Sequence, residues 1–252
     1  MLTYPRKNNR KSNQMREIKF TSNFNKYAAG SVLTEYGDTK VLCNASIVQS
    51  VPKFARSNNR KSGWLTAEYS MLPGATMARN DREAVKGKQS GRTQEIQRLI
   101  GRCLRSCINL KQLGEITIAI DCDVLQADGG TRTAAISGAY IAMVHAIQNL
   151  QYKKELLNDP ITEQIAAVSV GIVNNHKLLD LDFPEDSRAD TDMNIVMTKQ
   201  QQFIEIQGTA EKKPLSKHAM LGILDLAELG ITEIIQKQNE AILNNMPDLI
   251  IA

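Results

Sequence analysis

Residues 121–133 read DCDVLQADGGTRT, a stretch that leads from a strand through a double-glycine turn to a basic residue. Apolar and polar residues alternate over 116–124, which is typical of a half-buried strand. The glycine pair that ends at Gly130 then interrupts the strand. Because glycine has no Cβ, main-chain N–H groups can converge there on an anion. Thr131 and Arg132 begin an apolar-periodic run that predicts a helix, so we expect an anion, with phosphate the natural candidate, at this helix start.

A second basic helix start lies upstream in residues 82–105, REAVKGKQSGRTQEIQRLIGRCLR. Apolar residues recur at helical spacing from Ile96 to Ile108, so one face of this helix should pack inward. Arg92 stands just before the predicted helix, and Thr93 is its expected N-cap. A glycine pair alone is usually only a turn, but two cations at two helix starts favour an anion site.

The composition indicates a folded protein with an uneven distribution of charge. The chain has 252 residues, 42% of them hydrophobic, which suffices to bury a large core. Its net charge is +4, and basic clusters lie in the first half at residues 6–19, 53–61 and 79–105. Such clusters indicate either solvated surfaces or contact with a polyanion such as RNA.

The cysteines and the hydropathy of the chain indicate its compartment. The four cysteines show neither CxxC nor Cys/His ligand spacing, so we expect buried thiols rather than a zinc site. No apolar run is long enough to span a bilayer, and no apolar segment follows the positive charges of the N-terminus. The sequence therefore predicts a soluble cytoplasmic protein.

The order of predicted elements indicates an α+β fold with mixed sheets, in two strand-then-helix halves that meet near residue 155. The first half opens with strands over 16–49 that turn back at Gly37-Asp38 as a hairpin. A polar, basic loop at 50–63 is expected to contact phosphates, with Trp64 anchoring its end. The second half should contain strands at 165–173, 193–198 and 203–210 and a closing helix at 216–235. We expect a single domain over 1–252, with a basic N-terminal extension at about 1–14 and an apolar tail at about 241–252.

Acidic residues gather between the second-half strands, in LLDLDFPEDSRADTDMN at 178–194. Asp186 and Asp192 flank a loop that enters the strand at 193–198, so both could turn toward the mouth of the sheet. Hard oxygen ligands on a short loop suit Mg²⁺, which keeps several waters and bridges to substrate phosphates. From the residues alone, a solvated acidic loop is an equally good interpretation. The three histidines lie far from any Ser or Cys nucleophile motif, which gives a protein nucleophile little support.

Six blocks of sequence carry a resemblance to a known family. They are AGSVLTEYGDTKVLCNASI, GWLTAEYSMLP, KGKQSGRTQEIQRLIGRCLR, IDCDVLQADGGTRTAAISGAY, EDSRADTDMNIVMT and EIQGTAE. In this order, and over roughly Met15 to Ile235, they resemble ribonuclease PH. The resemblance implies the RNase PH fold, which is like ribosomal protein S5 domain 2, and a homohexamer built as a trimer of dimers.

The resemblance also implies an activity. It is that of a phosphorolytic 3′ to 5′ exoribonuclease, in which inorganic phosphate attacks the last phosphodiester of an RNA and releases a nucleoside diphosphate. The reverse reaction adds nucleotides from diphosphates, so the enzyme is a phosphate-dependent tRNA nucleotidyltransferase. Its expected substrates are RNAs with a single-stranded 3′ end, chiefly tRNA precursors. We also expect a role in rRNA processing.

Family roles can be carried over to the matching positions. Phosphate is implied at the residues of the GRT and GTR motifs, Arg92, Gly130, Thr131 and Arg132. The aspartates of the EDS and TDMN motifs, Asp186 and Asp192, are implied in catalysis and in binding Mg²⁺, and either could assist proton transfer. Our candidates for RNA backbone contacts lie near the Arg92 site and are Lys86, Lys88 and Arg98.

Three places depart from the family pattern, and one of them is the loop at 57–62, which is richer in Asn and Lys than expected. Residues 6–10 read RKNNR where the family usually has R-x-D-G-R. The sequence therefore does not predict whether this segment makes the contact that it makes in the family. Gly74 stands where an arginine is common. Because arginines in that loop commonly support ring assembly, the hexamer should either be weaker or rely on Arg79 or Arg82.

Two other classes of function compete with the phosphorolytic enzyme. An inert RNA-binding ring subunit would lose phosphate or aspartate positions, and this chain keeps them. A small-molecule phosphotransferase of the same fold would need a nucleotide-binding loop such as a Walker motif, and the sequence has none.

Overall fold

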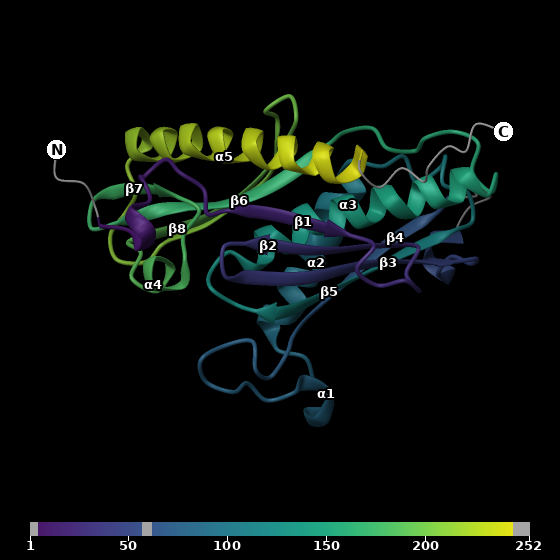
Figure 1. The fold of residues 1–252 in the computed structure, drawn as a ribbon, viewed down its shortest axis with the longest axis horizontal. Helices are drawn as coiled ribbons and strands as arrows, with labels where there is room; N and C mark the ends of the chain where they lie inside the picture. Colours follow the sequence, from purple (N-terminus) through teal and green to yellow (C-terminus); the bar gives the residue numbers. More distant parts are fainter. Residues whose placement is uncertain (1–4, 57–61, 244–252) are drawn as a thin grey trace.

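The first half of the chain forms a five-stranded mixed sheet (Figure 1). The computed structural model describes residues 5–56 and 62–243. The elements of this half are η1 Lys7–Asn9, β1 Ile18–Ser22, β2 Gly30–Tyr36, β3 Thr39–Val48, η2 Lys53–Arg56, β4 Trp64–Met71, α1 Glu83–Lys86, α2 Gly91–Ser106 and β5 Thr117–Gln126. The strand order is β1-β2-β3-β5-β4, and all pairs are antiparallel except β4 with β5, which α2 connects as a crossover. The predicted hairpin at Gly37-Asp38 is confirmed as the turn between β2 and β3.

The second half forms a four-stranded antiparallel sheet. Its elements are β6 Ile165–Val173, β7 His176–Leu179, α4 Phe183–Asp186, β8 Thr191–Thr198, β9 Phe203–Ala210 and α5 Lys217–Leu243. The strand order is β7-β6-β8-β9, and α5 packs along β6 and β7 and reaches β1 of the first sheet (Figure 1). Helix α5 continues past its predicted end at residue 235. The expected α+β fold class is confirmed.

Helix α3, Thr131–Tyr152, contacts both sheets. Its residues are buried on nearly all sides, as expected of a helix that is apolar all round. The Oγ of Ser137 accepts the N–H of Ala167 in β6 at 3.0 Å. Gln238 of α5 donates to the carbonyls of Ser137 and Ile165 at 3.0 and 3.1 Å. One continuous hydrophobic core therefore runs through both halves.

Strand β2 passes very close to α3 at Gly30. A Cβ on this residue would overlap the carbonyl oxygen of Ala142 and would lie 2.9 Å from the backbone nitrogen of Ala146. Both atoms belong to the backbone of α3, so they cannot rotate away. Glycine is thus required for the first sheet and α3 to approach this closely.

Gly30→Ala should therefore lower the free energy of unfolding by about 1–3 kcal/mol or more, because backbone must move to admit the methyl group. Urea unfolding followed by circular dichroism measures this. Gly74→Ala is the matched control, since a Cβ there meets nothing within 4 Å. Equal stability of the two variants would contradict the close approach of β2 and α3.

The N-terminal segment packs against the second half of the chain through buried arginines. Arg6 donates to the carboxylate of Glu185 at 2.6 and 2.7 Å. Arg10 donates to Asp180 at 3.2 Å and to Glu185 at 3.0 Å. Neither arginine side chain is more than 6% exposed. The expectation that the cluster at 6–19 faces a polyanion is therefore wrong for these two arginines, and residues 5–14 do not extend away from the fold.

The chain after the predicted basic loop is anchored by aromatic contacts. Trp64 meets Phe54 edge to face, with ring centroids 5.0 Å apart. The guanidinium of Arg105 lies over the Trp64 ring, 4.9 Å from its centroid. The expected anchoring by Trp64 is confirmed, whereas residues 57–61 of the loop lie outside the described part of the chain.

Other expectations concern the tail, the cysteines and the membrane. Residues 241–243 belong to α5, and the rest of the predicted tail, 244–252, lies outside the described residues. All four cysteines are buried with free thiols, as expected. Within 5–56 and 62–243, no helix combines the length and the apolar character that crossing a bilayer requires.

Candidate functional site

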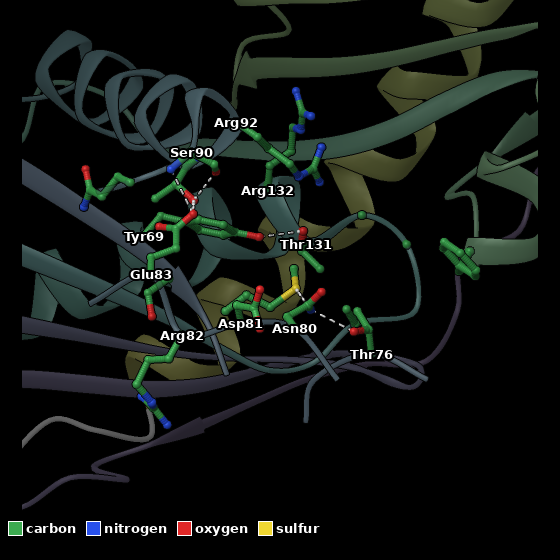
Figure 2. Close-up of a pocket in the computed structure, with 18 of the residues that line it drawn as sticks. Tyr69, Thr76, Asn80, Asp81, Arg82, Glu83, Ser90, Arg92, Thr131 and Arg132 are labelled. Atoms are coloured by element: carbon green, nitrogen blue, oxygen red, sulfur yellow. Dashed lines mark hydrogen bonds between the residues drawn. The ribbon is translucent and has the colours of Figure 1, made fainter. Parts of the chain in front are cut away.

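A large cavity of about 1170 Å³ lies where the two halves meet (Figure 2). From the first half it is lined by the end of β4, the long loop that contains α1, the start of α2 and the start of α3. From the second half it is lined by residues of β6, α4 and β8. Every residue that the sequence implies for phosphate or Mg²⁺ lines this cavity, namely Arg92, Gly130, Thr131, Arg132, Asp186 and Asp192.

The double-glycine turn leads from β5 into the start of α3. Gly129 and Gly130 have φ of 78° and 67°, the left-handed region that favours glycine. A Cβ on Gly129 would lie 2.6 Å from the carbonyl oxygen of Leu181, so the turn also packs tightly on the second half. Gly130 is the N-cap of α3 and offers no side chain to cap it. The first N–H groups of α3 therefore have no side-chain cap beside the cavity, an arrangement that suits an anion.

Thr131 adds an oriented hydroxyl to this helix start. The hydroxyl of Tyr69 donates to Thr131 Oγ1 at 2.9 Å (Figure 2). Burial raises the pKa of Tyr69, so the phenol stays neutral and keeps this proton. Thr131 can in turn donate its own hydroxyl proton into the cavity.

Helix α2 begins earlier than the sequence predicted. Its N-cap is Ser90, whose Oγ accepts the N–H of Thr93 at 3.1 Å. Thr93 was expected as the cap, and it lies inside the first turn because Ser90 competes for the same role. Glu83 of α1 accepts from the backbone N–H of Ser90 at 3.0 Å and from the hydroxyl of Thr93 at 2.9 Å. Arg92 is thus part of the first turn of α2, and its side chain is exposed.

Arg132 is held in place by two residues that sequence reasoning missed. Gln207 of β9 accepts from its guanidinium at 2.5 Å, and Glu95 of α2 forms an ion pair with it at 3.5 Å. Gln207 also donates to Glu95 at 2.8 Å. In Figure 2, Arg92 and Arg132 extend toward the same region of the cavity. Glu95 belongs to the motif GRTQE and Gln207 to the motif EIQGTAE, so both motifs could have pointed to them. That the two motifs lie side by side is seen only in the folded structure.

The two aspartates lie on the second-half wall of the cavity, Asp186 at the end of α4 and Asp192 in β8. Burial and the neighbouring Asp186 raise the pKa of Asp192 to about 6, against the opposing effect of Arg132 and Arg92. Burial likewise raises the pKa of Asp186, and the same two arginines oppose it. The interpretation as a solvated acidic loop is therefore wrong for these residues, which are partly buried and share one cavity.

This pair of carboxylates fits a magnesium ion. Within the described chain no group of three or more His, Cys, Asp or Glu side chains could enclose a metal. Mg²⁺ needs no such cage, since it commonly binds one or two carboxylates, several waters and substrate phosphates. Burial raises both pKa values, so the charged carboxylates are disfavoured without a cation beside them.

Of the three candidates for RNA contact, two line the cavity and one does not. Lys86 and Lys88 line the cavity, and Lys86 pairs with Asp81 at 2.7 Å in the loop around α1. Arg98 does not line the cavity; it is exposed on α2 and donates to the carbonyl of Gln94 at 3.2 Å. Phe183 was missed, although it is 52% exposed and lines the cavity from α4. Its signal was an aromatic residue within an otherwise acidic stretch.

Comparison with solved structures finds the same fold in rice Rrp46 and in two archaeal exosome structures. A structure of rice (Oryza sativa) Rrp46 matches with a TM-score of 0.74 at 17% identity, covering 92% of this chain and 98% of that one. An Archaeoglobus fulgidus exosome with RNA bound to the active site matches with a TM-score of 0.75 at 21% identity, covering 91% of each chain. An archaeal exosome core gives 0.69 at 20% identity, over 91% of this chain and 89% of that one. At these identities the matches establish the fold.

Comparison with family models covers most of the sequence. The model for the 3′ exoribonuclease family, domain 1, matches residues 14–147, and the model for domain 2 matches residues 163–229. The two matched segments correspond to the two sheets, and the cavity lies between them. Sequence blocks, fold and family models agree, and the chain belongs to the ribonuclease PH family of 3′ exoribonucleases.

Proposed function

We propose that this protein is a phosphorolytic 3′ to 5′ exoribonuclease, a phosphate-dependent nucleotidyltransferase that shortens RNA from its 3′ end. One observation carries the proposal: an uncapped helix start with two arginines shares a single cavity with two partly buried aspartates. Hydrolysis would need no site for a second phosphate. Such a site is required only when phosphate itself is the nucleophile.

The reaction brings two anions together. An oxygen of inorganic phosphate attacks the phosphorus of the last phosphodiester, the bond to the 3′ oxygen breaks, and that oxygen takes up a proton. The products are a nucleoside diphosphate and an RNA shorter by one nucleotide. Arg92, Arg132 and the N–H groups that follow Gly130 offset the repulsion between the two phosphates.

Asp186 and Asp192 would hold Mg²⁺, which supplies electrostatic stabilisation of the scissile phosphate and the departing oxygen. One of the two carboxylates assists proton transfer to the 3′ oxygen.

The RNA should enter past the loop around α1. Lys86 and Lys88 provide positive charge for its backbone, and the half-exposed ring of Phe183 provides a face for stacking a base. Such contacts do not read sequence, so a free single-stranded 3′ end is the requirement. We propose tRNA precursors as substrates, with rRNA processing as the related role, in the cytoplasm.

We also propose a homohexameric ring, a trimer of dimers. The loop that contains α1 projects from the body of the protein (Figure 1) and carries Arg79 and Arg82. Gly74 in the same loop has open space around its Cα. Light scattering of Arg79→Ala, Arg82→Ala and the wild type tests whether these arginines support assembly in place of an arginine at 74.

The direct test is to incubate the purified protein with Mg²⁺ and a 3′-tailed RNA, with and without inorganic phosphate. Chromatography then resolves the released nucleotides. Nucleoside diphosphates that appear only with phosphate are the expected result. Monophosphates would indicate hydrolysis and overturn the proposal, and bound RNA without release would favour an inert ring subunit.

Arg92→Ala should reduce phosphate-dependent release at least about 100-fold, because a preorganised cation next to the attacking phosphate is lost. The fold should be intact, since the Arg92 side chain is exposed. Rates are measured over a range of phosphate concentrations. Arg102→Ala is the control, because Arg102 is exposed on the same helix but does not line the cavity. Wild-type rates for Arg92→Ala at saturating phosphate would refute its role.

Asp192→Asn should abolish Mg²⁺-dependent turnover, keep RNA binding and yet stabilise the protein at pH 7. The pKa of Asp192 is raised from 3.8 to about 6 in the folded state, so the folded protein holds this proton more tightly than the unfolded chain does. That stabilisation is complete below pH 3.8 and is lost as the pH rises through about 6. At pH 7 the charged carboxylate is therefore a cost, which asparagine removes.

The expected gain is on the order of 1–3 kcal/mol at pH 7, and it should shrink below pH 4. Urea unfolding without Mg²⁺ at both pH values measures it. Asp225→Asn, at an exposed position of α5, is the control. A loss of stability and of RNA binding in Asp192→Asn would instead make the residue structural.

A further inference from the structure

One buried side chain, Arg16, contacts both the glycine turn at the candidate site and the segment after β7 in the second half. Its Nε and Nη2 donate to the carboxylate of Asp180 at 2.9 and 2.7 Å, just after β7. Its Nη1 donates to the carbonyl of Asp128 at 2.5 Å, and Nη2 lies 3.4 Å from the carbonyl of Gly129. The first pair of contacts is with the second half, and the other contacts are with the glycine turn of the first half. Arg16 therefore ties the second half to the glycine turn, whose Gly129 lines the cavity.

The surroundings of Arg16 leave it little freedom to move. The side chain is 8% exposed and passes Gly37, where a Cβ would lie 2.8 Å from its Cδ. Its partner Asp180 is buried and adopts a positive φ of 56°, which is uncommon for a residue other than glycine. Asp180 also accepts the backbone N–H of Arg16 at 2.8 Å. Strained backbone of this kind persists where surrounding contacts fix it.

The two sets of functional residues lie on opposite sides of this bridge. The residues for phosphate belong to α2 and to the glycine turn with α3, whereas Asp186 and Asp192 belong to α4 and β8. The glycine turn is further held by Thr39, whose hydroxyl donates to the carbonyl of Gly129 at 2.7 Å and accepts the N–H of Asp128 at 3.0 Å. The distance between a phosphate bound at the glycine turn and the two aspartates thus depends on how this turn is held against the segment after β7.

Arg10 provides an internal comparison. It belongs to the same buried cluster and is as inaccessible as Arg16. Its partners are Asp180, Asp182 and Glu185, all in the second half. Losing Arg10 would leave buried carboxylates short of a partner, as losing Arg16 would, but it would remove no contact with the glycine turn.

We propose that Arg16 is a positioning residue that sets the distance between the phosphate-binding turn and the aspartate pair. The inference rests on the proposed function, since it concerns the alignment of phosphate with the scissile bond. A displacement of about 1 Å at such a site can cost about 100-fold in rate. Loss of this alignment should act on phosphate use and turnover, and it should leave RNA binding unchanged, because Lys86 and Lys88 lie on the loop around α1, away from the contacts of Arg16.

The test compares Arg16→Lys, Thr39→Val and Arg10→Lys in the full-length protein. Release of nucleoside diphosphates is measured against phosphate concentration, RNA binding by fluorescence anisotropy, and Tm by circular dichroism. We expect Arg16→Lys and Thr39→Val to raise the KM for phosphate and lower kcat, by about 10-fold to 100-fold in kcat/KM. Arg10→Lys should lose a similar amount of Tm and keep the KM for phosphate within about twofold, a contrast that a merely stabilising role of Arg16 would not produce.

Equal changes of phosphate KM in Arg16→Lys and Arg10→Lys at similar Tm would overturn the inference and leave the proposed function standing. If Arg16→Lys does not fold, Thr39→Val decides, because it loosens the same turn without unpairing a buried charge. A wild-type KM for phosphate in Thr39→Val would then overturn the inference. Absence of phosphate-dependent release in the wild type would overturn the proposed function and the inference with it.

Discussion

The burial of α3 against both sheets is the constraint on which the rest of the structure depends. A helix that is apolar on all sides must be covered on all sides, and neither half of the chain can do this alone. Its direction and depth are therefore fixed by two sheets and α5 together. The start of α3, which directly follows the glycine turn, consequently lies at the junction of the two halves of the chain. The uncapped N–H groups of this helix start are thereby placed opposite groups from the second half.

The electrostatics of that junction follow from its position. Arg132 is neutralised in part by Glu95, yet Arg92 is exposed and available to a ligand. On the opposite wall, burial makes the charged forms of Asp186 and Asp192 unfavourable. The cavity thus has cationic side chains on one wall and carboxylates whose charge burial disfavours on the other. Functional sites commonly sacrifice stability in this way, and the remainder of the core compensates for it.

Local patterns allowed much of the fold to be predicted from the sequence. Alternation identified β5, a continuous apolar run identified β6, and the Gly37-Asp38 turn identified a hairpin, while the family blocks named arginines and aspartates that line one cavity. Sequence spacing could not show which of two nearby capping residues, Ser90 or Thr93, begins α2, because both are good caps. Nor could it show that Arg6 is buried: its carboxylate partner is 179 residues away. A basic residue with such a distant partner looks like any surface charge until the fold is known.

The pairing of the first residues with a segment near residue 180 has a consequence for how the protein is made. A ribosome releases the first sheet, with its glycine turn, well before the carboxylates that bind the N-terminal arginines. Arg6 and Arg10 therefore remain hydrated and without these carboxylate partners while more than half of the chain is still being synthesised. Contacts of such long sequence separation form late and slow the final step of folding. The nascent chain therefore has no complete cavity until its second sheet has formed and packed against the N-terminal segment.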